Sequence, residues 1–331
     1  MTSDSEASPV AAPLGGDGTA PAQITGGALG DRIYSAAITL FALCVPILLL
    51  LIALEIGIAG WPALRQFGLG FLTSDVWNPV AEQFGAGPAI YGTLVSSAIA
   101  LLIATPLALG SAIFLSEFAP RWLRQPLSFL VDLLAAIPSV VYGLWGIFVL
   151  VPLLRQYVAP FFRDTLGLAD TALFAGPTYG PSMLAAGLIL SIMVLPYIAA
   201  VSREVLLAVP RSQREAALAL GATRWESIWG AVLPYARTGI LGGVILGLGR
   251  ALGETMAVTM VIGNRHDISA SLLAPGYTMA SLIANEFTEA SGDLHLSALM
   301  AVGFVLFVIT LIVNAIARWL VWRVGRVGAG T

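Results

Sequence analysis

The chain is 331 residues long, with 58 % hydrophobic residues, 11 % charged residues and a mean hydropathy of +0.89. Soluble proteins carry about 25 % charged residues, so this composition excludes an ordinary soluble domain and indicates a membrane protein. The formal net charge is −3 and all 16 basic residues are arginine, which excludes a P-loop ATPase site because that loop requires a lysine.

The first segment, residues 1–30, is rich in Ala, Gly, Ser, Thr and Pro and has no hydrophobic period. A segment of this kind buries too little apolar surface to fold, so we predict a disordered tail. Its first charges are acidic, and the apolar run that follows is long enough to span a bilayer. Both features disfavour a cleaved signal peptide.

Six apolar segments follow, each close to or above the roughly 20 residues that a transmembrane helix requires. They predict an all-α polytopic membrane protein with six transmembrane helices in a domain over residues 31–325. The expected spans are 33–58, 90–116, 127–153, 181–203, 238–262 and 297–319.

The arginines outside these spans are distributed unevenly. Positive residues that flank a span stay on the cytoplasmic side of the membrane. With both termini in the cytoplasm, eleven arginines lie inside and four outside, which favours this orientation. The inner set is Arg32, Arg121, Arg124, Arg203, Arg211, Arg214, Arg224, Arg237, Arg318, Arg323 and Arg326, and the outer set is Arg65, Arg155, Arg163 and Arg265.

A polar stretch at 204–236 separates the fourth and fifth spans, on the predicted cytoplasmic side. Ser212 precedes Glu215 by three residues, and Thr223 precedes Glu226 by the same spacing. Each pair matches a capping box, in which the hydroxyl and the carboxylate satisfy backbone amides at the start of a helix. The stretch therefore predicts two short helices, at 213–220 and 224–232.

Glycine and proline mark the ends of these two helices. Gly221 is expected to end the first in a left-handed turn, and Leu233-Pro234 to close the second. Ala216 and Ala217 follow Glu215 and keep the first helix slim, which lets a partner protein approach its backbone closely. An amphipathic hairpin on the membrane surface is the alternative, to which Trp225 and Trp229 are suited.

Span five carries two charged residues, Arg250 and Glu254. At 1.5 Å per residue they lie roughly 18–24 Å along the helix, within the hydrocarbon, where one arginine costs about 2.5–3.5 kcal/mol. Gly239, Gly243 and Gly247 fall on the same face, so this face is expected to pack against another helix. The pair either neutralises itself and joins helices, or marks a pathway for an ion or substrate, with a planar guanidinium suited to phosphate.

Span three places Asp132, Ser139, Gly143 and Gly146 at helical spacing on one face, with Pro138 interrupting the helical ladder. Ser139 is either part of a core kink or a substrate contact, because freed backbone groups at membrane depth are tolerated where they line a cavity. Asp132 is expected to pair with a cytoplasmic arginine.

The two histidines, His266 and His295, stand alone in outer loops without ligand spacing. We therefore expect no metal site. No nucleophile and base occur in an arrangement that indicates catalysis.

Three runs together resemble the permeases of bacterial phosphate ABC importers, of the PstC type. The first is the EAA loop, formed by Glu215-Ala216-Ala217, Gly221 and Leu233-Pro234, although Ala231 stands where its consensus usually has Ile. The other two are narrower in distribution: DLLAAIPSVVYGLWG at 132–146 and GRALGETMA at 249–257. The resemblance covers about residues 30–325 and implies a type I ABC-importer permease (MetI-like) architecture.

The resemblance also implies a function and a set of partners. The chain would carry inorganic phosphate by alternating access across the bacterial cytoplasmic (inner) membrane, with Arg250 meeting the phosphate charge. It would work with a second permease subunit (PstA type), two ATPase subunits (PstB type) and an extracytoplasmic phosphate-binding protein (PstS type). ATP and Mg would be bound by the ATPase subunits, so we expect no cofactor on this chain, no enzymatic activity of its own and no nucleic-acid partner.

Three alternatives remain open. The nearest is a permease of the same architecture for sulfate, molybdate or another oxyanion. A second is an ion-coupled secondary transporter that uses Arg250 and Glu254 as a relay. A third is a channel-like scaffold without transport of its own.

Overall fold

A computed structural model describes residues 28–176 and 178–327, in two compact units that meet between Ile52 and Ala53. The described part of the first unit is one helix, the N-terminal portion of α1 (Ala28–Phe67). The predicted disorder of residues 1–27 lies outside the described residues, whereas residues 28–30 already belong to α1.

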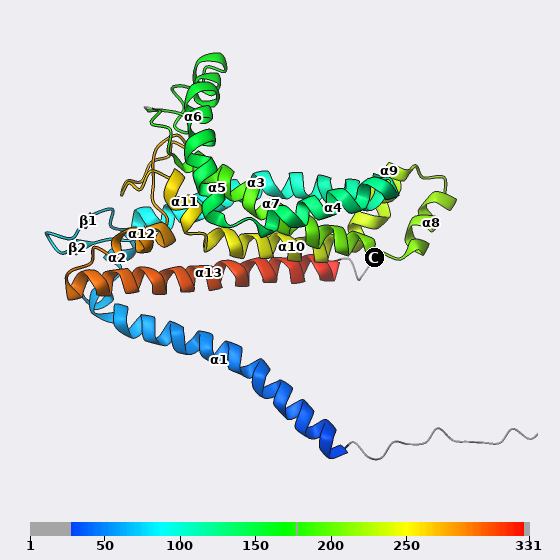
Figure 1. Ribbon diagram of the computed structural model, residues 1–331, viewed down its shortest axis with the longest axis horizontal. Helices are drawn as coiled ribbons and strands as arrows, with labels where there is room; N and C mark the ends of the chain where they lie inside the picture. The colour runs from blue at the N-terminus through cyan, green and yellow to red at the C-terminus, as the bar shows by residue number, and fades with distance from the viewer. Residues whose placement is uncertain (1–27, 177, 328–331) are drawn as a thin grey trace, which may run out of the picture. The chain divides into compact units, whose positions relative to one another are not determined.

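Among the described residues, six helical segments are long and apolar enough to cross a membrane, as the sequence predicted (Figure 1). Five of them begin earlier or end later than expected but cover most of the predicted range. The segments are Gly30–Phe67, Gly87–Phe118, Ser139–Thr165, Met183–Leu207, Arg224–Leu252 and Asp293–Arg323.

In the second unit these segments consist of one or more helical elements, and further elements connect them. Five of the elements are π-helical turns, labelled η1 to η5, and two strands pair antiparallel, with Trp77 opposite Phe84. The elements in chain order are α2 (Gly70–Thr73), β1 (Trp77–Asn78), β2 (Gln83–Phe84), α3 (Gly87–Ile113), η1 (Phe114–Phe118), α4 (Arg121–Ala136), α5 (Ser139–Trp145), η2 (Gly146–Leu150), α6 (Val151–Leu153), η3 (Leu154–Val158), η4 (Phe161–Thr165), α7 (Met183–Leu207), α8 (Arg211–Ala219), α9 (Arg224–Ser227), η5 (Ile228–Val232), α10 (Leu233–Leu252), α11 (Met256–Val261), α12 (Met279–Glu286) and α13 (Asp293–Val327).

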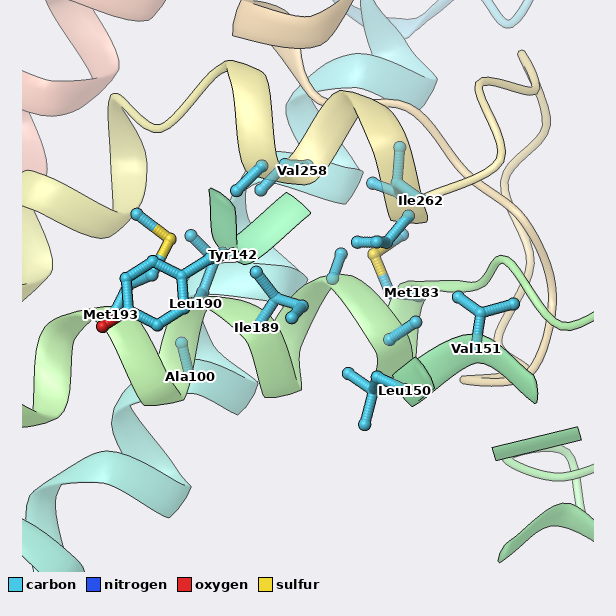
Figure 2. Close-up of a cluster of buried hydrophobic side chains, with 14 of the residues drawn as sticks. Ala100, Tyr142, Leu150, Val151, Met183, Ile189, Leu190, Met193, Val258 and Ile262 are labelled. Atoms are coloured by element: carbon cyan, nitrogen blue, oxygen red, sulfur yellow. The ribbon is translucent and has the colours of Figure 1, made fainter. Parts of the chain in front are cut away.

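Helix α7 is the central element of the second unit and contacts α3, α4, α10 and α11. Figure 2 shows part of the core that it builds, in which Ile189, Leu190 and Met193 of α7 cluster with Tyr142 and Val258. Lipid tails are as apolar as these side chains, so helices in a bilayer associate through close van der Waals packing. The α7 core therefore holds the surrounding helices in fixed positions.

The third predicted span, 127–153, is wrong in its boundaries. Helix α4 ends at Ala136, Ile137 is extended with ψ 129°, and a new helix, α5, begins at Ser139. The residue before a proline is pushed out of the helical conformation, and here Pro138 separates two helices instead of bending one. Asp132 therefore lies on a different helix from Ser139, and it is exposed without an ion pair to a described arginine.

The fifth predicted span, 238–262, is also interrupted. Helix α10 ends at Leu252, and α11 begins at Met256. Between them, Gly253 lies outside the helical conformation at φ −98° and ψ 2°. The predicted continuous helix through Arg250 and Glu254 is therefore wrong, since Glu254 lies in this break.

The two histidines, which stand apart in the sequence, both contact the ring of Trp77 in one aromatic cluster. His266 stacks on Trp77 with ring centroids 5.6 Å apart, and His295 lies 6.0 Å from the same ring. His295 also stacks on Phe84, and its Nε2 lies 3.4 Å from a carboxylate oxygen of Glu286. Burial lowers the pKa of His266 to about 4, against the weaker opposite effect of Asp267. Among the described residues no group of three or more His, Cys, Asp and Glu is arranged to hold a metal.

At Gly92, α3 lies against the backbone of the segment that precedes α12. We therefore predict that Gly92 cannot be replaced by a residue with a side chain. A Cβ at this position would overlap the backbone carbonyl of Tyr277. We expect Gly92→Ala to destabilise the fold by roughly 1–3 kcal/mol, as overpacking does. Thermal unfolding in detergent measures this, with Gly110→Ala as the control, because nothing lies within 4 Å of a Cβ at Gly110 of the same helix. Equal midpoints for the two variants would contradict this packing.

Acid should destabilise the aromatic cluster through His266. Its pKa falls from 6.5 in the free side chain to about 4 here, so the folded state favours the neutral ring. This contribution to stability is complete above pH 6.5 and is lost as the pH falls toward 4. We expect the thermal midpoint to decrease over this window, and the decrease to be smaller in His266→Phe, which keeps a stacked ring. An identical pH dependence in both proteins would refute the assignment.

Candidate functional site

A depression of about 660 Å³ opens beside α7, α10 and α13 and is lined by two arginines. We call it the arginine depression. It brings together the predicted residues Arg250 and Glu254. Its full lining is Tyr197, Gly242, Ile245, Leu246, Gly249, Arg250, Gly253, Glu254, Asn314 and Arg318.

Arg250 is held by an aromatic ring instead of a carboxylate. Its guanidinium carbon lies 4.7 Å from the ring centroid of Tyr197. The hydroxyl of Tyr197 donates a hydrogen bond of 2.9 Å to the carbonyl of Ala135, which fixes the ring. The Nε of Arg250 is buried and has no hydrogen-bond partner. Among the described residues no hydrogen bond or ion pair occupies its Nη groups, so the guanidinium is oriented while these donors remain available to an anion.

Glu254 does not neutralise Arg250. Among the described residues Arg250 forms no ion pair, and a carboxylate oxygen of Glu254 accepts a long hydrogen bond of 3.4 Å from the amide of Ala257. The i,i+4 pairing requires a continuous helix, and α10 ends before Glu254. The interpretation of a self-neutralising pair is therefore wrong.

The glycines of α10 do pack against another helix, as predicted. Cβ atoms at Gly239, Gly243 and Gly247 would meet Val205, Val201 and Ile198 of α7, respectively. This contact with α7 explains why Arg250, one turn beyond Gly247, reaches Tyr197 on the same helix.

The structure does not bring Ser139 to the arginine depression. Ser139 is the first residue of α5, is half-buried and is absent from the lining. The glycines that follow it pack against neighbouring helices, since a Cβ at Gly143 would meet Met260 and one at Gly146 would meet Val261. The core-kink interpretation fits this placement better than a substrate contact.

Sequence reasoning missed three polar residues of the depression, Tyr197, Asn314 and Arg318. Asn314 and Arg318 are four residues apart in an apolar span, a spacing that places them on one helix face. That signal was present, but Arg318 was assigned only to the cytoplasmic flank. The side-chain amide of Asn314 donates 2.8 Å to the carbonyl of Thr310, which leaves its oxygen as an acceptor.

The polar stretch between spans four and five forms the predicted hairpin of two short helices, α8 and α9. Gly221 has φ +88° and ends α8 as expected. Its amide donates 3.0 Å to Leu218, and the amide of Ala222 donates 3.2 Å to Ala217, the bonds of a Schellman motif. The predicted capping box of Thr223 and Glu226 is also formed.

Two details of the hairpin prediction are wrong. Helix α8 begins at Arg211, directly after Pro210, so Ser212 lies inside the helix and caps nothing. Pro234 does not close the second helix, because α9 continues through η5 into α10. Leu233 and Pro234 lie at the join of η5 and α10, where Pro234 has no amide to donate to the preceding turn.

An arginine of α8 joins the hairpin to the ends of two membrane helices. Arg214 donates to both carboxylate oxygens of Glu117 in η1, with a shortest distance of 2.7 Å. The same guanidinium donates to the carbonyls of Leu206, at 2.8 Å, and Val209, at 2.6 Å. The hairpin is therefore fixed to η1 and to the end of α7.

The remaining surface of the hairpin is open. No residue of α8 is buried, and Glu215 and Ala216 are exposed. Leu220 is 90 % exposed and Trp225 is 56 % exposed. An exposed apolar surface of this kind beside charged residues is typical of a face that contacts another protein or the membrane surface.

Comparison with known proteins identifies the family of this architecture. Residues 104–326 match the model of the binding-protein-dependent transport system inner membrane component family. Among solved structures, a bacterial alginate ABC transporter in complex with alginate-bound periplasmic protein aligns with a TM-score of 0.58 at 17 % identity, over 90 % of this chain and 98 % of that chain. An inward-facing MetNI methionine ABC transporter aligns with a TM-score of 0.52 at 17 % identity, over 71 % and 94 %.

Curated relatives are more similar. The phosphate transport system permease protein PstC of Mesorhizobium japonicum is 52 % identical, over 91 % of this chain and 93 % of that protein. The protein of the same name from Xylella fastidiosa (strain Temecula1) is 49 % identical, over 90 % and 93 %. The probable phosphate transport system permease protein PstC of Methanocaldococcus jannaschii is 40 % identical, over 79 % and 85 %.

These matches and the six apolar helices make the chain a multi-pass protein of the inner membrane and a transporter component rather than an enzyme. The chain belongs to the binding-protein-dependent transport system inner membrane components and, within them, to the PstC permeases, with the MetI-like architecture of type I ABC importers.

Proposed function

We propose that this chain carries inorganic phosphate into the cell by alternating access, as one permease subunit of an ATP-driven importer. The observation that carries the proposal is an unpaired guanidinium, that of Arg250, in a depression between membrane helices. The names of the relatives, which are phosphate transport permeases, supply the identity of the anion.

The chemistry of the arginine depression suits an oxyanion. A guanidinium presents several N–H donors in a plane and binds phosphate oxygens in a bidentate manner. Stacking on Tyr197 holds Arg250 in place but does not neutralise its positive charge. A bound anion would neutralise that charge. Glu254 lies in the same lining, where its carboxylate would weaken anion binding and favour release.

The energy for transport would come from partner subunits. We place both termini and the hairpin in the cytoplasm, where the exposed face of α8, with Glu215, Ala216, Ala217 and Gly221, would dock on an ATPase. Two ATPase subunits (PstB type) would bind ATP and Mg, a second permease (PstA type) would complete the pathway, and a phosphate-binding protein (PstS type) would deliver the anion. Arg214 would transmit movement of the hairpin to η1 and α7.

Removal of the Arg250 guanidinium should abolish uptake. Charge-assisted hydrogen bonds contribute about 1.5–3 kcal/mol each, so Arg250→Ala should reduce phosphate uptake by roughly a hundredfold in reconstituted vesicles. Arg250→Lys keeps the charge without the planar fork and should be intermediate. Subunit copurification and ATP hydrolysis report assembly and should not change. Uptake by Arg250→Ala at the wild-type rate would exclude the pathway. Competition by sulfate or molybdate tests the identity of the oxyanion.

Distortion of the hairpin at Gly221 should uncouple hydrolysis from transport. Its φ of +88° is strained for a β-branched residue, so Gly221→Val should lower the number of phosphate ions imported per ATP hydrolysed. Gly221→Asn is the control, because asparagine tolerates the left-handed region better than other residues with side chains. The ratio of uptake to hydrolysis in vesicles is the measurement, and a wild-type ratio in Gly221→Val would show that the coupling geometry is wrong.

A further inference from the structure

Arg318 is the second arginine of the arginine depression and has no partner among the described residues. It forms no ion pair, hydrogen bond or ring contact there, and its side chain is exposed. Asn314, one turn earlier on the same helix, is half-buried and lines the same recess. Two guanidiniums and one carboxylate therefore share the depression, which gives its lining a net positive charge.

The two arginines lie at different depths along the helices. Helices α10 and α13 are in contact and run in opposite directions (Figure 1). Arg250 is in the last turn of α10, far from the hairpin, whereas Arg318 is near the end of α13. Since the lining of α10 starts at Gly242, the recess extends roughly 12 Å along that helix before it reaches Arg250. Because the two helices are antiparallel, residues later in α13 lie toward the start of α10, so Arg318 lies on the hairpin side of Asn314 in this recess.

An arginine near the end of a span often has a simpler role, because cationic side chains extend to the membrane surface. Arg323, on the same helix, has a contact of that kind, since its guanidinium carbon lies 5.6 Å from the ring centroid of Trp319. Arg318 lacks such a contact and belongs instead to a recess that already holds one unpaired guanidinium. The difference between the two arginines favours a ligand for Arg318.

We propose that Arg318, with Asn314 beside it, forms a second binding site for a phosphate oxyanion on the hairpin side of Arg250. The proposal rests on the proposed function and adds a step to it, in which the anion passes from Arg250 to Arg318. An ion crosses a membrane efficiently when its binding is strong enough for entry but weak enough for exit. Several sites along the pathway meet both requirements. The oxygen of Asn314 accepts a hydrogen bond from the P–OH group of a protonated phosphate.

Uptake by the complete importer in phosphatidylcholine vesicles is the first test. Arg318→Ala should lower phosphate uptake by roughly tenfold or more, the usual consequence of losing a charge-assisted hydrogen bond. Arg318→Lys should recover part of the rate, and Arg323→Ala, the matched control, should keep nearly all of it. ATP hydrolysis and copurification should stay unchanged. Wild-type uptake by Arg318→Ala would overturn the proposal.

Protection of a cysteine tests binding without transport. The chain has one cysteine, Cys44, so Cys44→Ala gives a cysteine-free background for Asn314→Cys. Inorganic phosphate should slow its reaction with an anionic thiol reagent, and Arg318→Ala should remove this protection. Arg323→Cys in the same background should react equally with and without phosphate. Protection that survives Arg318→Ala would refute the site.

Two further outcomes separate the possible sources of failure. Vesicles that contain phosphatidylglycerol, tested without free phosphate, reveal a lipid headgroup at Arg318, and protection there alone would overturn the free-anion site. If the wild-type importer carries no phosphate while phosphate still protects the cysteine, the proposed function fails and the site remains.

Discussion

Close packing of α10 against α7 is the constraint from which the candidate site follows. Glycines at 239, 243 and 247 leave room for Val205, Val201 and Ile198. Any larger residue on this stripe would push the helices apart. The same contact continues one turn further, where Arg250 lies over Tyr197. These three glycines therefore set the position of the Arg250 guanidinium.

The end of α10 explains why Arg250 forms no ion pair with Glu254. Because α10 stops at Leu252, Glu254 does not continue the face that carries Arg250. Its carboxylate interacts weakly with the start of α11, and the arginine remains without a counter-charge. A continuous helix would have placed the two groups within reach of one another and would have consumed the positive charge that an anion requires.

Local and non-local features differed in how well the sequence predicted them. Apolar length predicted the six spans, and the Thr223–Glu226 box and Gly221 were correct because those contacts lie within a few residues. The effect of proline differed from one position to another. Pro106, Pro126 and Pro196 remain inside helices, whereas Pro138 separates two. That outcome depends on neighbours in space. The contacts of Arg250 with Tyr197 and of Arg214 with Glu117 join residues far apart in the chain, so no spacing rule indicated them.

The continuous helical path from α9 through η5 into α10 has a mechanical consequence. These elements cover Arg224–Leu252, 29 residues without a break, which corresponds to about 40 Å at 1.5 Å per residue. The path is not uniform, because it contains the π-helical turn η5 and Pro234, two features at which helices bend. A tilt of the hairpin would therefore be absorbed in part at this joint, and only the remainder would reach the end of α10, where Arg250 lies. The hairpin face that would dock on an ATPase and the guanidinium of Arg250 would then lie at opposite ends of one helical path.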